Sequence, residues 1–159
     1  MTVRRVLEIL SIAGVLLIVW TTAAAMYGPA GLPARIPLHF NAAGNPNGWG
    51  SRGALLTLPI AAVLLYILMT VVARYPSAFN YPVRVTPQNR PRLEALALEM
   101  IAWLKAEIVW LLVWIQHVTI EIARHGRGSL SPLFMPLVLT AVFGTIIGYV
   151  IALRRAGRA

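Results

Sequence analysis

The chain has 159 residues, a formal net charge of +9 and no cysteine, and 58% of its residues are hydrophobic. Its mean hydropathy of +0.73 exceeds what the core of a soluble domain of this size requires. The lack of cysteine excludes disulfides and thiolate metal ligands. The arginines stand at the ends of apolar runs rather than along one polar face, which is typical of a membrane protein and argues against a nucleic-acid partner.

Four apolar stretches are each close to the roughly 20 residues that cross a bilayer as a helix. Backbone polar groups must be satisfied internally in lipid, so we predict an all-α integral membrane protein that forms a single domain, residues 1–159. The first stretch is too long for a cleaved signal peptide, and we expect it to be a retained helix. The helices are expected at about residues 6–26, 54–73, 91–122 and 133–153, with an outer loop at 27–53 and an inner loop at 74–90.

The distribution of arginine predicts the orientation of these four transmembrane helices. With the N-terminus inside, nine arginines are cytoplasmic and four are outside. The nine are Arg4, Arg5, Arg74, Arg84, Arg90, Arg92, Arg154, Arg155 and Arg158, and the four are Arg35, Arg52, Arg124 and Arg127. By the positive-inside rule this excess predicts an N-in, C-in topology, and the reverse orientation is the alternative.

The outer loop carries strong local signals. In residues 36–41, Ile36, Leu38 and Phe40 alternate with Pro37, His39 and Asn41, which predicts a short extended segment with one apolar face. Pro33 and Pro37 restrict this segment to an edge or isolated strand because neither donates a backbone hydrogen bond. Asn-Pro-Asn-Gly at residues 45–48 predicts a turn, and Trp49 stands where an interfacial aromatic anchor belongs.

Two interpretations of this ordered loop remain open at this point. It is either a connector that folds back on the membrane surface or a recognition surface, since loops with fixed geometry often carry function. For the second interpretation the candidate residues are His39, Phe40, Asn41, Asn45 and Trp49.

The segment LPARIPLHFNAAGNPNGWGS resembles the signature loop of a bacterial domain of unknown function. That domain occurs in SdpI-type immunity proteins and in many short membrane proteins. The stretch from Phe79 to Thr86, followed by a helix containing Trp103-Leu104-Lys105, is similar to the short members. The resemblance implies a multi-pass protein of the bacterial cytoplasmic (inner) membrane. It also implies protection against a secreted peptide toxin or capture of a repressor at the membrane, and it supplies no catalytic residues.

The third helix carries a polar stripe. At 100° per residue, seven residues fall close to one line: Glu99, Trp103, Glu107, Trp110, Trp114, His117 and Glu121. An ionisable group in the membrane normally faces protein or water. The stripe is therefore either satisfied within the bundle or lines a polar cavity that binds a ligand or moves a proton. Lys105 points to the other side of the helix, at a depth that predicts a contact with Glu8 of the first helix.

His117, Glu121 and His125 stand at i, i+4 steps, and with His39 they would suffice for a metal site. The spacing is common and Arg124 would oppose a cation, so we expect ordinary interfacial histidines, no metal and no cofactor. The chain has no aspartate and no phosphate-binding or nucleophile motif, so we predict a non-enzymatic protein.

Three hypotheses of function follow from these features. The first is an immunity or sensing module that recognises a peptide or lipid at its outer loop. The second is an accessory or scaffold subunit of a larger membrane complex or an oligomer, in which Gly144 and Gly148 form a small-xxx-small helix contact within the bundle or between subunits. The third is a small transporter or membrane enzyme that uses the polar stripe. The lipid bilayer is a partner in every case.

Overall fold

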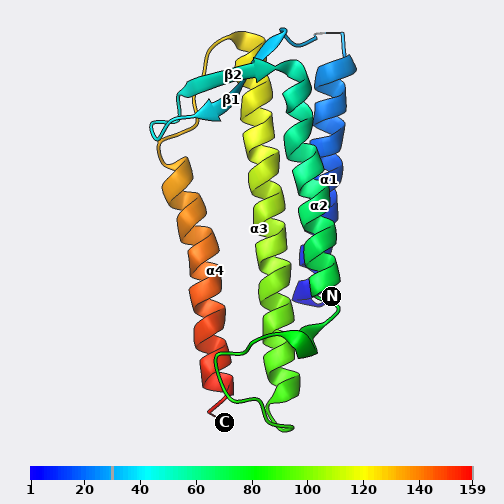
Figure 1. Ribbon diagram of the computed structural model, residues 1–159, viewed down its shortest axis with the longest axis vertical. Helices are drawn as coiled ribbons and strands as arrows, with labels where there is room; N and C mark the ends of the chain where they lie inside the picture. Colours follow the sequence, from blue (N-terminus) through cyan, green and yellow to red (C-terminus); the bar gives the residue numbers. More distant parts are fainter. Residues whose placement is uncertain (30, 159) are drawn as a thin grey trace.

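The computed structural model describes residues 1–29 and 31–158. Long helices run side by side, and a two-stranded sheet covers one end of them (Figure 1). Both chain ends lie toward the opposite end. The helices are α1 (Val3–Tyr27), α2 (Thr57–Val72), α3 (Arg90–His125) and α4 (Phe134–Ala156), with short 3-10 turns η1 (Arg52–Leu56) and η2 (Pro76–Ala78). The strands are β1 (Arg35–Phe40) and β2 (Pro46–Ser51).

Three helical stretches are long and apolar enough to cross a membrane, namely Val3–Tyr27, Arg52–Val72 and Phe134–Ala156. Their outward surfaces carry large exposed apolar side chains, which a lipid environment would cover. The helix α3 differs from them because it carries Lys105, Glu107 and Gln116 in its middle. The three apolar helices indicate a membrane protein.

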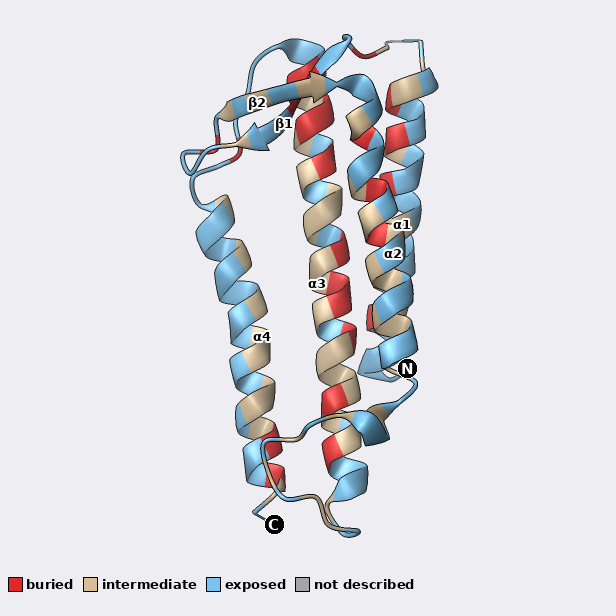
Figure 2. Cartoon of the chain, in the orientation of Figure 1, coloured by how far each residue is buried: buried red, intermediate tan, exposed pale blue. Residues whose placement is uncertain are grey.

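The packing centres on α3, whose buried residues face α1 and α2 (Figure 2). At the hairpin end of the bundle, named the outer end after the predicted orientation, Ala25 of α1, Leu55 of η1 and Ile120 of α3 form one apolar cluster with Ile36 of the sheet. By contrast, α4 is buried only near its C-terminal end, where Leu153 packs against Leu93 and the inner loop. Along most of its length α4 is therefore the least enclosed of the helices.

The helices α1 and α3 approach each other closely at Gly14, which belongs to no recognisable sequence motif. A Cβ atom at Gly14 would lie 2.6 Å from Cγ1 of Val109, so only glycine permits this spacing. At Gly144 and Gly148, in contrast, an added Cβ would meet no atom within 4 Å among the residues described. Gly144 and Gly148 therefore do not form a close helix contact within the bundle. A contact of these glycines between subunits, the other alternative, stays a prediction.

The outer loop folds into an antiparallel hairpin in which Arg35 pairs with Ser51 and Phe40 with Pro46. The expected extended segment is β1. The expected turn at residues 45–48 is wrong, because this stretch lies mostly in β2 and the chain reverses at residues 41–45. There the Asn41 N–H donates to the Asn45 carbonyl at 2.9 Å, and the Asn41 side chain accepts from the Asn45 N–H at 3.0 Å. This Asx-type bonding favours the earlier turn.

Gly44 completes that turn and ties it to the connection between α3 and α4. Its φ of +81° is a conformation that other residues rarely adopt. Its carbonyl accepts a hydrogen bond from the Leu130 N–H at 2.8 Å, and an added Cβ would overlap the Leu130 carbonyl oxygen. This hydrogen bond therefore fastens the tip of the hairpin to the loop that connects α3 with α4.

Replacing Gly44 by alanine should open this tip. We expect a local destabilisation of about 2 kcal/mol, because the left-handed backbone and the overlap with Leu130 both oppose a side chain. Faster hydrogen exchange of the amides of residues 41–51 and 130 would measure it. Gly31→Ala is the matched control, since Gly31 also has a positive φ, of +56°, but has open space for a Cβ within the described structure. Equal exchange in both variants would contradict the tie to Leu130.

The inner loop between α2 and α3 is also ordered. The Tyr81 hydroxyl donates to the Pro76 carbonyl at 2.9 Å, and the Asn89 side chain accepts from the Thr86 N–H at 2.8 Å. Burial, with a smaller contribution from the Glu94 carboxylate, raises the pKa of the Tyr81 hydroxyl. This loop closes the inner end of the bundle against α4.

Candidate functional site

A cavity of about 250 Å³ lies between the hairpin and the outer ends of α2 and α3. The hairpin contributes its apolar face, and η1 and α2 contribute the opposite wall. The polar residues of its lining are Gln116 and Thr119 of α3 and Thr57 of α2. Its lining consists of Ile36, Pro37, Leu38, Phe40, Ala54, Leu55, Thr57, Leu58, Ile115, Gln116 and Thr119.

Gln116 is the unusual member of this lining, because it is only 1% exposed and its side-chain amide oxygen has no hydrogen-bond partner among the described residues. Its Nε2 donates to Oγ1 of Thr22 at 2.6 Å and to the Leu55 carbonyl at 3.1 Å. The Thr22 hydroxyl donates its proton to the Ile18 carbonyl at 2.6 Å, so its oxygen acts as the acceptor in the hydrogen bond from Gln116. Both partners are therefore acceptors, and the amide cannot be reversed without losing both bonds.

The Gln116 Oε1 atom is consequently a buried acceptor with no donor among the described residues. Leaving such an atom unsatisfied costs about 1–3 kcal/mol. Gln116 is part of the cavity lining, so a ligand whose N–H or O–H group reached this oxygen would recover this free energy. The chemistry of the site thus favours an apolar molecule with a hydrogen-bond donor.

Of the five recognition residues expected from the sequence, Phe40 alone is in the lining of this cavity. His39 and Asn47 contact each other on the exposed side of the hairpin, with Nδ1 of His39 2.5 Å from Oδ1 of Asn47. Asn41 and Asn45 form the turn, and Trp49 is 47% exposed. The structure therefore separates a polar outer surface of the hairpin from an apolar inner one. Sequence reasoning missed Gln116, since a single amide in an apolar helix gives no motif.

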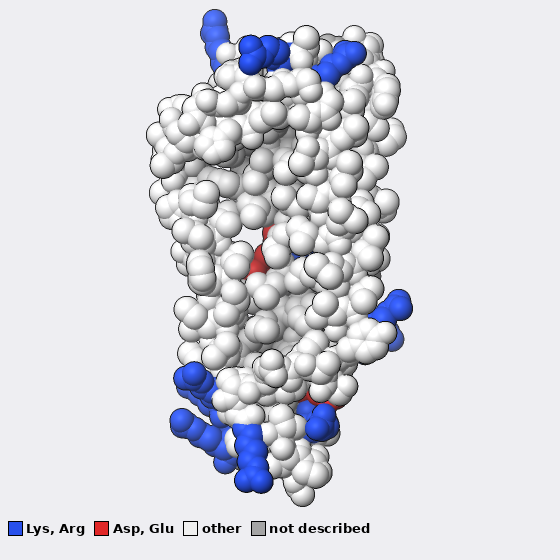
Figure 3. Space-filling view, viewed as in Figure 1, with Lys and Arg blue, Asp and Glu red and all other residues white. Residues whose placement is uncertain are grey.

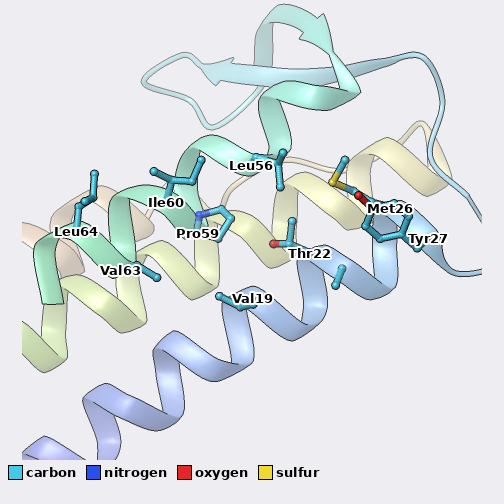
Figure 4. A pocket seen from close by; sticks show the side chains of 10 residues that line it. Val19, Thr22, Met26, Tyr27, Leu56, Pro59, Ile60, Val63 and Leu64 are labelled. Atoms are coloured by element: carbon cyan, nitrogen blue, oxygen red, sulfur yellow. The ribbon is translucent and has the colours of Figure 1, made fainter. Parts of the chain in front are cut away.

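A second cavity, of about 350 Å³, opens between the outer halves of α1 and α2 (Figure 4). Val19, Thr22 and Met26 line it from α1, and Pro59 and Val63 from α2. Its walls are nearly all apolar, and it lies between two helices of membrane-spanning character. Acyl chains of the bilayer suit such a groove, so it needs no dedicated ligand.

Glu107 of the predicted polar stripe faces α4. Its Oε1 accepts a hydrogen bond from the Thr145 hydroxyl at 2.5 Å, while its buried Oε2 has no partner in the described chain. A cavity of about 270 Å³ beside it is lined otherwise by apolar residues of α3 and α4. Figure 3 shows acidic atoms at the bottom of a hollow about halfway along the molecule, whereas most other charged side chains on this face lie toward its two ends.

The other members of the stripe do not converge on Glu107. The Trp110 indole donates to the Leu10 carbonyl of α1 at 3.1 Å, and the rings of Trp114 and His117 lie 6.1 Å apart. Trp103, Trp110 and Trp114 are exposed to the surroundings of the bundle. Glu99 lies beside Tyr149 of α4. The stripe residues thus make separate contacts along the length of α3.

At the outer end of the stripe, Nδ1 of His125 lies 3.0 Å from the Glu121 carbonyl and 3.5 Å from the Glu121 carboxylate. His39 is engaged with Asn47 in the hairpin. Among the described residues no three His or Glu side chains come together in a way that would hold a metal ion.

Lys105 and Glu8 form the contact expected between α1 and α3, which is confirmed. The Lys105 Nζ donates to Oε2 of Glu8 at 2.6 Å and to Oγ1 of Thr70 at 3.0 Å, and it lies 4.7 Å from the centre of the Tyr66 ring. The Tyr66 hydroxyl donates to Oε1 of Glu8 at 2.5 Å. One buried cation thus joins three helices, since Tyr66 and Thr70 belong to α2.

These features define a class: a helical membrane protein with a folded hairpin over a small cavity at one end of the bundle. Residues 14–70, from the middle of α1 through the hairpin to the end of α2, match a family described as a domain of unknown function (DUF1648). An uncharacterized protein of Archaeoglobus fulgidus is 41% identical over 59 residues, which cover 32% of this chain and 32% of the relative. No solved structure matches the chain.

Proposed function

We propose that this chain is a non-enzymatic recognition module whose hairpin, and the cavity beneath it, bind an apolar peptide outside the membrane. The observation that carries the proposal is the apolar cavity beneath the hairpin, whose lining includes Gln116, a buried amide with an oxygen that has no partner among the described residues. The N–H groups of an extended peptide are donors of the required kind. Leu38 and Phe40 would contact its apolar side chains.

The proposal includes a four-span topology with both chain ends in the cytoplasm of a bacterial cell. The excess of arginine at the end opposite the hairpin supports this orientation. In α3, the ion pair of Lys105 and the hydrogen bond of Glu107 reduce the cost of polar groups at membrane depth, so this helix is suited to be the fourth span.

The similarity of residues 14–70 to DUF1648 supports a link to the SdpI-type immunity proteins, in which that domain occurs. An immunity or sensing role would need a peptide site on the outer surface, and the hairpin with its cavity is a site of that kind. The matched segment contains the hairpin, η1 and most of α2, which supply eight of the eleven residues that line the cavity, and α3 supplies the other three.

The test measures binding of fluorescently labelled, short apolar peptides to the full chain in lipid nanodiscs. We expect saturable binding of at least one peptide, weakened about tenfold or more when its amides are N-methylated, because the donor to Gln116 is lost. Ala54→Phe, which fills the cavity, should abolish binding. If no peptide binds, or if Ala54→Phe binds as the parent does, the proposal is wrong.

Two variants serve as controls and address the alternative hypothesis. Ala141→Phe adds the same side chain to the cavity beside Glu107, and Glu107→Gln removes the only ionisable group there. Both should leave peptide binding unchanged. Loss of binding in Glu107→Gln, with an intact helical spectrum, would instead favour the transporter or enzyme hypothesis, for which the unpartnered Oε2 of Glu107 is the supporting observation.

A further inference from the structure

The end of the bundle opposite the hairpin contains a separate cavity of about 560 Å³. It lies between the first turns of α1, the end of α2 and the middle of α3. Arg4, Arg5 and Lys105 bring positive charge to it, and Glu8 brings one carboxylate. The remaining lining consists of Thr2, Ala73, Leu98, Ile101 and Ala102.

The carboxylate of Glu8 does not neutralise this cavity. Both of its oxygens are occupied, one by the Lys105 ammonium and the other by the Tyr66 hydroxyl. Lys105 and Glu8 therefore cancel, and the two guanidinium groups of Arg4 and Arg5 remain. Neither arginine lies within 4 Å of an acidic group in the part of the chain that the structure describes. The cavity thus carries a net charge of about +2 from these two groups.

We propose that this cavity binds the phosphate of an anionic phospholipid headgroup. Guanidinium groups bind phosphate oxygens through paired, charge-assisted hydrogen bonds, and a basic pocket between membrane helices is suited to a lipid head. The first turn of α1, where the helix dipole favours an anion, brings Thr2, Arg4 and Arg5 to the lining.

The walls of the cavity favour a lipid over a soluble anion. Leu98 and Ile101 form an apolar side next to the charged one, as the glycerol and first methylenes of a phospholipid require. Large apolar side chains of α1 and α2, such as Ile9 and Val72, are exposed near this end. An acyl chain can therefore continue from the cavity along the membrane-facing surface. This inference is independent of the peptide site at the outer end.

Native mass spectrometry of the full chain in detergent would test the proposal, with dioleoyl phosphatidylglycerol and dioleoyl phosphatidylcholine as probes. We expect phosphatidylglycerol to bind more tightly, and the double variant Arg4→Gln/Arg5→Gln to lose roughly tenfold in its affinity. The matched control is Arg154→Gln/Arg155→Gln. These residues form an exposed arginine pair at the end of α4 that lies outside the cavity lining. The control should change affinity less than about twofold.

A second variant keeps every charge. Ala73→Trp places a large side chain in the cavity and should also weaken phosphatidylglycerol binding. This variant tests the proposal even if the arginine variant inserts poorly into the membrane. Inorganic phosphate in excess should not displace the lipid; full displacement would show a site for free phosphate and overturn the proposal. Equal binding of the two lipids, equal losses in both arginine pairs, or unchanged binding in Ala73→Trp would also overturn it.

Discussion

Replacing Glu8 by alanine is expected to destabilise the bundle by about 3 kcal/mol. Lys105 is only 4% exposed, and the loss of Glu8 would leave its charge buried with a threonine hydroxyl and a tyrosine ring as its remaining partners. The figure lies at the lower end for a buried pair because the Glu8 side chain is itself 38% exposed. Unfolding of the full chain in mixed micelles, followed by tryptophan fluorescence, would measure it.

Lys105→Met supplies the counterpart of this variant. It leaves Glu8 with its tyrosine donor and with access to the inner cavity, so its cost should be clearly smaller than that of Glu8→Ala. The double variant Glu8→Ala/Lys105→Met should be less destabilised than the sum of the two single variants, as the uncompensated charge is absent. Additive losses would mean that the pair does not stabilise the contact of α1 with α3.

Replacing Gly14 by valine is expected to cost about 2–3 kcal/mol and to push α1 away from α3. A Cβ at this position would overlap Val109, which is 1% exposed and cannot move aside. The hydrogen bond from Trp110 to the Leu10 carbonyl crosses the same contact and should be lost. Thermal unfolding in micelles would report the stability, and a shift in tryptophan emission would report the change near Trp110.

Gly144→Val and Gly148→Val are the controls for this prediction. An added side chain meets no described atom within 4 Å at either position, so the monomer should keep its stability. If the two glycines form a contact between subunits, as the small-xxx-small pattern predicts, these variants should instead lower the oligomer mass on native gels. A loss of monomer stability equal to that of Gly14→Val would contradict the packing described for α4.

Several properties of this protein follow from the sequence alone. Long apolar runs predict helices that cross a membrane, because the bilayer thickness and the need for internal hydrogen bonds leave few alternatives. The alternation at residues 36–41 predicts the strand β1, because its period of two is a local property. The expected single apolar face is wrong, because Ile36 and Pro37 are both buried and Leu38 is exposed, and the strand register shifts after Pro37. The contact of Glu8 with Lys105 was predictable because two opposite charges at the same membrane depth have few other partners.

Other properties were decided only by the tertiary structure. The two glycines that control close packing, Gly14 and Gly44, depend on what lies opposite them, namely Val109 and Leu130. The turn occurs at residues 41–45 and not at 45–48 because hydrogen bonds of Asn41 and Leu130 outweigh the local preference of Asn-Pro-Asn-Gly.

The candidate site divides in the same way. Phe40 was predictable as part of an ordered loop, whereas Gln116 was not, because its role depends on Thr22 and Leu55 from distant parts of the chain. The sequence shows only that the amide of Gln116 lies in an apolar helical stretch. Whether one of its atoms is left without a partner beside a cavity depends on how the hairpin and three helices come together.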